Sequence, residues 1–352
     1  MKPSDLEEKH PGMVLENPDE LTKEQIDNVT AFFSLLSEPS QSQARQAFIR
    51  FVIDGGADDW SQFIDESIQE SIGLFNEMFQ LRNLRSQGRL RFSLLRSLWE
   101  GPYPVLVRFM EVVTAIQVRT GRMVTKSVRF PDWIVLLIQI AAHPGETIKN
   151  FEKYSGPSLL VLAETLNWAG ISKSDLVYFT LDLREWLYLT TGSNYYYEET
   201  QGCSRFFSEC DLFFSSHLSE VKRFFESANS NQLADAISVL SACEFEFALL
   251  IEEIVTLSVS SYATASKLAL PIVTEHKGKA LPLLLKVLEE GKAQERNKAV
   301  LVLASLYGDL VAEPLRKILM HEKSRIVRQS IETYLKSWEA SEIPATGDNE
   351  AD

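Results

Sequence analysis

The chain has 352 residues, 45% of them hydrophobic, and a formal net charge of −14. This apolar content is enough to bury a sizeable core, which excludes an intrinsically disordered chain. Nucleic-acid-binding proteins usually carry a net positive charge, so the negative net charge argues against this class. Three cysteines, an odd number in a long chain, argue against a disulfide framework and fit a reducing compartment.

No segment of the sequence predicts export or a membrane span. The N-terminal residues lack an apolar signal region, and the longest largely apolar stretch, residues 133–142, is too short to cross a bilayer. We therefore expect a cytoplasmic protein with no membrane partner. Residues 1–20 are expected to form a mobile acidic tail.

Helical periodicity dominates the N-terminal half. A capping-box pattern from Thr22 to Gln25 opens the first helix, which Pro39 closes, and a second helix stops at Gly55. A third helix begins near Asp58. Apolar residues at helical spacing predict further helices over 74–87, 89–99, 102–120, 131–142, 157–168 and 174–190.

An internal boundary is predicted at residues 191–202. This segment is rich in turn formers and contains Tyr195, Tyr196 and Tyr197, which cannot all lie on one helix face. Two interpretations are open: either the segment is a long loop whose tyrosines pack on the body of the protein, or the tyrosines form an aromatic contact surface.

The boundary separates an N-terminal helical domain, 21–190, from a C-terminal helical domain, 203–338. Helices are predicted in the second domain near 203–215, 217–228 and 231–258, and the small, polar and acidic residues 339–352 are expected to be disordered. No segment alternates apolar and polar residues over the length of a strand. The predicted fold class is therefore all-α, an irregular array of antiparallel helical hairpins.

Two C-terminal segments match at a constant offset of 32 residues, so that Pro282 aligns with Pro314 and Arg296 with Arg328. Each segment has the pattern of a helix with a proline in its first turns, a short polar link, and a second helix that begins near an arginine. Such a hairpin cannot bury both apolar faces alone. The two hairpins are therefore expected to stack on their neighbours.

The two segments, 279–307 and 311–338, resemble HEAT repeats, the helical hairpins of armadillo-like α-solenoids, in the proline of the first helix and the arginine of the second. The resemblance implies an α-α superhelix whose surface binds proteins, as a scaffold or adaptor without catalytic activity. The links EEGKAQ and MHEKS lack the aspartate that is common in the family. We therefore expect a weakened polar ladder between the repeats.

The sequence predicts no catalytic residue, no metal site and no cofactor. It contains no G-x-S-x-G nucleophile turn and no phosphate-binding glycine loop, and its five histidines fall in no metal-ligand spacing. Cys203, Cys210 and His217 are spaced to share one helix face, but a zinc site would need a fourth ligand. We interpret the cysteines as buried structural thiols.

Basic residues concentrate between 82 and 130. Ten Arg or Lys and two acids there give a charge of +8, which leaves −22 for the rest of the chain, and residues 278–338 carry eleven Arg or Lys against seven acids. Either the arginines pair with acids such as Asp65 and Glu66, or they form a surface that binds an acidic peptide or a phosphate-bearing ligand. The candidate residues are Arg82, Arg85, Arg89, Arg91, Arg96, Arg119, Arg122 and Arg129.

A protein is the expected partner, and nucleic acid is the alternative. Some HEAT-like arrays bind DNA, and a few resemble alkylpurine DNA glycosylases. Because residues 82–129 are basic, they are the segment through which this chain would bind nucleic acid. Long-range repulsion from the net charge of −14 opposes tight binding unless these basic residues meet on one concave face.

Overall fold

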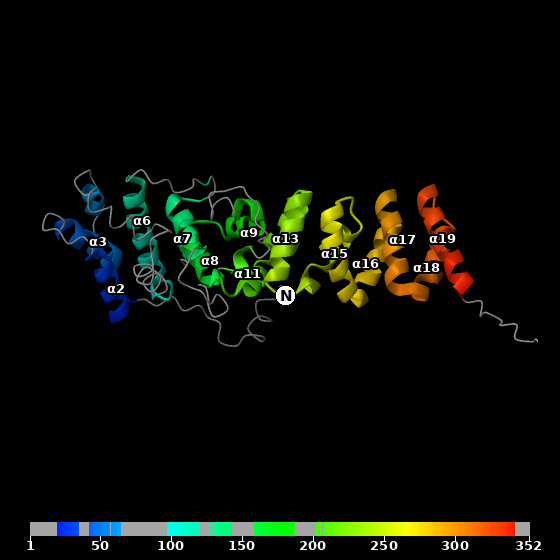
Figure 1. Cartoon of the computed structure of the whole chain (residues 1–352), viewed down its shortest axis with the longest axis horizontal. Helices are drawn as coiled ribbons and strands as arrows, with labels where there is room; N and C mark the ends of the chain where they lie inside the picture. The colour runs from blue at the N-terminus through cyan, green and yellow to red at the C-terminus, as the bar shows by residue number, and fades with distance from the viewer. Residues whose placement is uncertain are drawn as a thin grey trace, which may run out of the picture. The chain divides into compact units, whose positions relative to one another are not determined.

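A computed structural model gives the fold of the chain (Figure 1). It describes residues 20–34, 42–56, 58–64, 97–119, 127, 130–142, 158–186, 202–205 and 207–341. Within these ranges the elements are helices and no strand occurs, which confirms the predicted all-α class. None of the described helices is long and apolar enough to cross a membrane.

The chain divides into two compact units, an N-terminal unit, Met1–His217, and a C-terminal unit, Leu218–Asp352. The boundary predicted at 191–202 lies outside the described residues except at its last position, so it stays a prediction. The tail predicted from residue 339 also lies outside them, apart from the end of the last helix, which runs to Ser341.

The helices of the N-terminal unit pack around α6, which spans Tyr103–Arg119 and contacts α3, α7 and α8. Figure 1 shows α6 between α3 and α7. Buried side chains such as Phe109 and Val113 form the apolar face of α6. The other elements are α2 (Lys23–Phe33), α3 (Ser42–Asp54), η2 (Asp58–Phe63), α7 (Asp132–Ala142), α8 (Leu159–Trp168), α9 (Lys173–Leu181), η5 (Gly202–Arg205) and α11 (Cys210–Ser216).

The predicted capping box at the start of α2 is confirmed. The Thr22 hydroxyl accepts a hydrogen bond from the Gln25 backbone N–H at 3.3 Å, and the Gln25 side-chain oxygen accepts one from the Thr22 N–H at 2.9 Å. The Gln25 amide also donates to the Ser97 carbonyl at 2.7 Å. The Gln25 side chain therefore caps the start of α2 and also holds this helix against Ser97, a residue distant in sequence.

The end of α3 depends on Gly55 and on an arginine from α6. Gly55 has a φ of +67°, a left-handed conformation that favours glycine, and a Cβ there would lie 2.8 Å from a guanidinium nitrogen of Arg108. Arg108 donates to the carbonyls of Val52 and Ile53 at 3.1 and 3.0 Å. A positive charge thus caps the C-terminal end of α3, where the helix dipole is negative.

The single helix predicted over 174–190 is wrong, because α9 ends at Leu181. The Asp182 carboxylate accepts hydrogen bonds from the backbone N–H groups of Arg184 and Glu185, both at 3.2 Å. An aspartate in this position caps a new helical turn instead of continuing the old helix. The Asp182 side chain therefore competes with the helix backbone for these N–H groups and interrupts the helix, although the apolar pattern continues past it.

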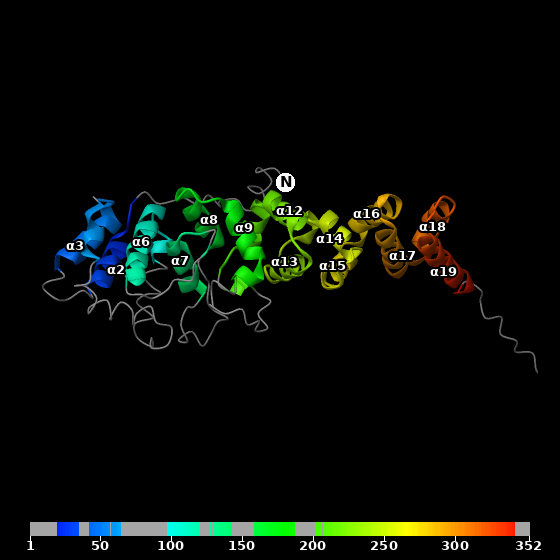
Figure 2. The same cartoon turned by 90° about the horizontal axis from the view of Figure 1, so that it is seen from above.

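The C-terminal unit is a stack of helical hairpins (Figures 1 and 2). The hairpins are α14–α15, α16–α17 and α18–α19, and contacts of α13 with α15, α14 with α16 and α17 with α19 join them in series. Their bounds are α14 Ile251–Ser258, α15 Ala263–Glu275, α16 Lys277–Glu290, α17 Ala293–Tyr307, α18 Ala312–Leu319 and α19 Arg325–Ser341. The unit begins with α12 (Leu218–Ser227) and α13 (Ser230–Ala242), and short turns η6 (Phe247–Leu249) and η7 (Gly308–Val311) join helices.

The segment 231–258, predicted as helical throughout, is divided. Helix α13 ends at Ala242, and Glu244 adopts a left-handed φ of 55°, which a right-handed helix cannot include. The chain then passes through η6 before α14 begins. The break allows α14 to start a new hairpin with α15.

Candidate binding surfaces

Most of the predicted site residues lie outside the described part of the chain. This holds for Tyr195, Tyr196 and Tyr197, and for every candidate arginine except Arg119. Arg119 is the last residue of α6, and only its backbone is described. The arginine surface and the tyrosine surface therefore stay predictions.

The last two hairpins of the C-terminal unit, α16–α17 and α18–α19, share a polar network centred on Glu322. Glu322 lies in the link between α18 and α19, and its side chain is only 5% exposed. It accepts hydrogen bonds from Nε and Nη2 of Arg296, on α17, at 3.0 and 2.9 Å. The same guanidinium donates to the Gly291 carbonyl at 2.7 Å, so Arg296 joins its own link to the next one. The expected weakening of the polar ladder is wrong at this step, because glutamate supplies the paired oxygens.

The second repeat arginine, Arg328, has a related role inside its own hairpin. Its Nη1 donates to the carbonyls of Leu319 and Glu322, both at 3.1 Å. Leu319 is the last residue of α18, so the guanidinium satisfies a carbonyl at the C-terminal end of that helix. The arginine recognised from the 32-residue offset thus closes the link of each hairpin.

The electrostatics of Glu322 follow from this network. Burial of the carboxyl raises its pKa, but the hydrogen bonds from Arg296 and from the Ser324 backbone N–H, with the charge of Arg296, outweigh burial. The pKa of Glu322 therefore lies below its usual value. The carboxylate is a charged structural element of the inter-hairpin contact at neutral pH.

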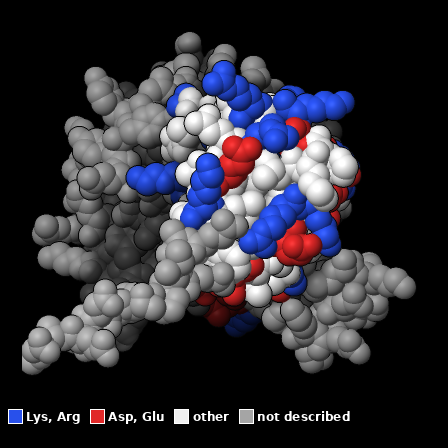
Figure 3. Space-filling view, turned by 90° about the vertical axis from the view of Figure 1, so that its right-hand side faces the viewer, with Lys and Arg blue, Asp and Glu red and all other residues white. Residues whose placement is uncertain are grey.

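Figure 3 shows Lys and Arg side chains spread over one face of the molecule, with Asp and Glu side chains between them. A cavity of about 460 Å³ lies at the links of the two hairpins, and its basic side chains include Lys317 and Lys323. Lys317 lies 3.8 Å from Glu313, one helical turn away. The remaining lining residues are Leu288, Glu289, Arg296, Ile318, His321 and Glu322. The excess of basic residues over 278–338 is the sequence signal for this surface.

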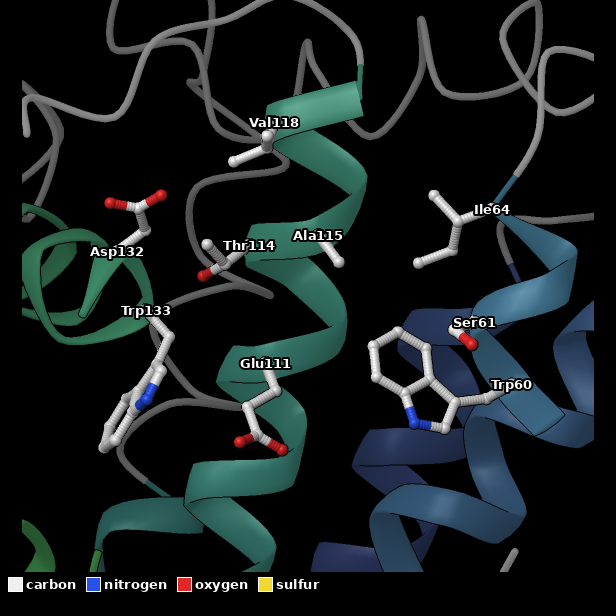
Figure 4. Close-up of a pocket in the computed structure, with 9 residues that line it drawn as sticks. All are labelled: Trp60, Ser61, Ile64, Glu111, Thr114, Ala115, Val118, Asp132 and Trp133. Carbon is white, nitrogen blue, oxygen red and sulfur yellow. The ribbon is translucent and has the colours of Figure 1, made fainter. Parts of the chain in front are cut away.

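A second cavity, of about 590 Å³, lies in the N-terminal unit and was not indicated by any motif (Figure 4). In the described part of the chain three elements line it, and its walls include two tryptophans, Trp60 and Trp133, and two acids, Glu111 and Asp132. The other lining residues are Ser61, Ile64, Thr114, Ala115 and Val118. The only trace in the sequence is an Asp-Trp pair at 59–60 and again at 132–133.

His217 is not part of a metal centre in the described residues. Its Nδ1 lies 2.8 Å from the Phe213 carbonyl, and its ring lies 4.7 Å from the Phe213 ring, centroid to centroid. The histidine therefore packs on the end of its own helix. The proposed sharing of a face with Cys203 and Cys210 does not produce a ligand set that includes it.

We expect the cysteines to remain thiols without a stoichiometric metal. Cys203, Cys210 and Cys243 are all buried thiols, and a structural zinc site normally has four protein ligands. Elemental analysis of protein purified without chelator should detect no stoichiometric zinc, and titration after denaturation should give three thiols per chain. A stoichiometric zinc, or a lower thiol count, would contradict this prediction.

Comparisons with protein-family models, with curated proteins and with solved structures found no match to this chain.

Proposed function

We propose that this chain is a non-catalytic adaptor that binds another protein through the surface of its C-terminal hairpins, which are HEAT-like repeats. The repeat assignment is supported by the stacking of α16–α17 on α18–α19 and by the equivalent bonding of Arg296 and Arg328 to the links. Proline lies in the first turns of the first helix of each hairpin. Arrays of this kind offer extended surfaces suited to macromolecular partners.

One observation carries the proposal. At the 32-residue offset Met320 takes the place of Leu288, which is buried in the stack, yet the Met320 side chain is 71% exposed. The last described hairpin therefore displays a side chain that serves as a packing contact in the preceding hairpin. Ile326 is a second exposed apolar side chain at the start of α19.

The surroundings of these side chains indicate the chemistry of the partner. Lys317, Lys323 and Arg325 are exposed in the same hairpin. Apolar side chains bordered by charges are typical of protein interaction surfaces. The surface suits a protein segment that carries both apolar and acidic residues.

The experiment compares partner binding by the full chain and by a double variant, Met320→Glu with Ile326→Glu. A partner co-purified with the wild type, identified by mass spectrometry and purified, should bind the double variant at least about tenfold more weakly. Thermal unfolding should be nearly unchanged, because both positions are exposed.

The matched control is Leu268→Glu with Leu270→Glu, which changes exposed leucines of α15 in the same way. It should bind as the wild type does. Equal partner binding by all three proteins would show that the surface of the last hairpin is not the binding site. Binding of a mixed-sequence DNA duplex at moderate salt would instead favour the nucleic-acid alternative.

A further inference from the structure

The cavity between η2, α6 and α7 in the N-terminal unit combines aromatic walls with negative charge. From this combination we infer that it binds the cationic head of a lysine or arginine side chain presented by a partner protein. The inference goes beyond the proposed function, since it concerns the other unit and the opposite charge. Its support is the placement of Trp60, Glu111, Thr114 and Trp133.

Two indole rings lie on either side of α6. Figure 4 shows Trp60 coming from η2 on one side and Trp133 from α7 on the other, with the Glu111 carboxylate between them in this view. Trp60 is held by its neighbours, because its ring stacks on Phe51 with a centroid distance of 5.0 Å and lies 6.4 Å from Phe48. Phe51 thus occupies one face of the Trp60 ring, and a ring fixed in this way can attract an organic cation at its other π face.

The described lining of the cavity contains the carboxylates of Glu111 and Asp132 but no lysine or arginine. Neither carboxylate makes a hydrogen bond or an ion pair to another described residue. Arg108, one turn from Glu111 on α6, donates instead to the carbonyls at the end of α3. Burial raises the pKa of Glu111, and the charge of Arg108 opposes this only in part. A cation entering the cavity would supply the missing direct partner.

Thr114 provides an independent indication of a ligand that forms hydrogen bonds. The residue is only 6% exposed, and its Oγ1 is buried with no hydrogen-bond partner among the residues that the structure describes. Buried hydroxyls are normally paired, so this one marks an unfilled position. An ammonium or guanidinium N–H can donate to Oγ1, and the carboxylates in the same lining favour such a cation over an anion.

The apolar part of the lining fits the stem of a long basic side chain. Ile64, Ala115 and Val118 lie at one end of the cavity in Figure 4, and Glu111 with the two indoles lies at the other. Lysine and arginine bury their methylene stems along apolar surface while the charged head reaches polar groups. A divalent metal ion fits less well, because the two tryptophans and the three aliphatic side chains of the lining offer it no oxygen ligand.

The binding test uses the full chain and three short peptides as probes. Acetyl-Gly-Lys-Gly-amide and acetyl-Gly-Arg-Gly-amide carry the cation, and acetyl-Gly-norleucine-Gly-amide carries the stem alone. Titration is followed by NMR of the indole N–H groups, assigned with Trp60→Phe and Trp133→Phe. At least one cationic peptide should shift both signals saturably, and the norleucine peptide should bind about tenfold more weakly or less.

Two variants and a control locate the binding. Glu111→Gln should weaken binding of the cationic peptide about tenfold, and Thr114→Val should weaken it by a smaller factor. Thr114→Val should also unfold at or above the wild-type temperature, because it removes an unpaired buried hydroxyl of similar volume. Glu24→Gln, an exposed position on α2, removes the same charge and should bind as the wild type does.

Three outcomes would overturn the inference. The first is the absence of a saturable shift with the wild type. The second is equal weakening by Glu24→Gln and Glu111→Gln, which would show general attraction to a chain of net charge −14. The third is binding of butylammonium as tight as that of the peptides, which would indicate a free organic cation as the occupant. None of these results affects the test on Met320 and Ile326, so the two proposals fail separately.

Discussion

Leu303→Asp is expected to destabilise the C-terminal unit by about 3 kcal/mol or more, since it buries an unpaired charge. Leu303 is 0% exposed and lies on α17, which packs on α16 and α19. The charged side chain must lose its hydration or force the hairpins apart. Urea unfolding, together with hydrogen exchange of the α17 and α19 amides, measures the loss of stability.

The neighbouring residue Leu301 provides the control. Leu301→Asp introduces the same side chain into the same helix at a position that is 57% exposed, so it should change the stability by no more than about 0.5 kcal/mol. If both variants unfolded at the same urea concentration, the stacking of α17 between neighbouring helices would be wrong. A loss confined to Leu303→Asp would support the hairpin array.

Local signals in the sequence predicted the elements that depend on them. The capping box at Thr22 needs residues within one turn, and the end of α3 at Gly55 needs a backbone that adopts positive φ. The 32-residue offset predicted both C-terminal hairpins, because the arginine of each repeat donates to a carbonyl within its own hairpin. The periodicity failed at Asp182, where one side chain caps a new turn.

Features that join distant segments had no comparable signal. The cavity brings together Trp60, Glu111 and Trp133, and no spacing within one helix could place them side by side. The capping of α3 by Arg108 also depends on how α6 packs, and nothing in the local pattern of either helix indicates it. The excess of lysine and arginine over 278–338 partly indicated the basic surface. Its apolar component, Met320, could be identified only once the structure showed that the equivalent Leu288 is buried.

Glu322→Gln is the second change with a large expected effect, about 2 kcal/mol at neutral pH. The substitution removes the charge that holds Arg296 while keeping the shape of the side chain. The Nε and Nη2 groups of Arg296 then lose their charged hydrogen-bond acceptor in a nearly buried site. Urea unfolding of the full chain at several pH values measures the difference from the wild type.

The difference should depend on pH in a defined direction. Because the folded-state pKa of Glu322 is lowered, its contribution is fully present above the unfolded value of about 4.3 and is lost as the pH falls through the folded pKa. The wild type should therefore approach the variant in stability only in acid, where the carboxyl is protonated. Glutamine does not titrate, so the variant lacks this part of the pH dependence.

Glu332→Gln separates this contact from an ordinary surface pair. Glu332 lies 3.7 Å from Arg328 one turn away, but its side chain is 45% exposed, so its removal should cost no more than about 0.5 kcal/mol. Added salt should also screen this exposed pair more than the nearly buried pair of Arg296 and Glu322. A Glu322→Gln effect that was equally large in acid, or as small as that of Glu332→Gln, would mean that the Arg296–Glu322 contact does not stabilise the stack through its charge.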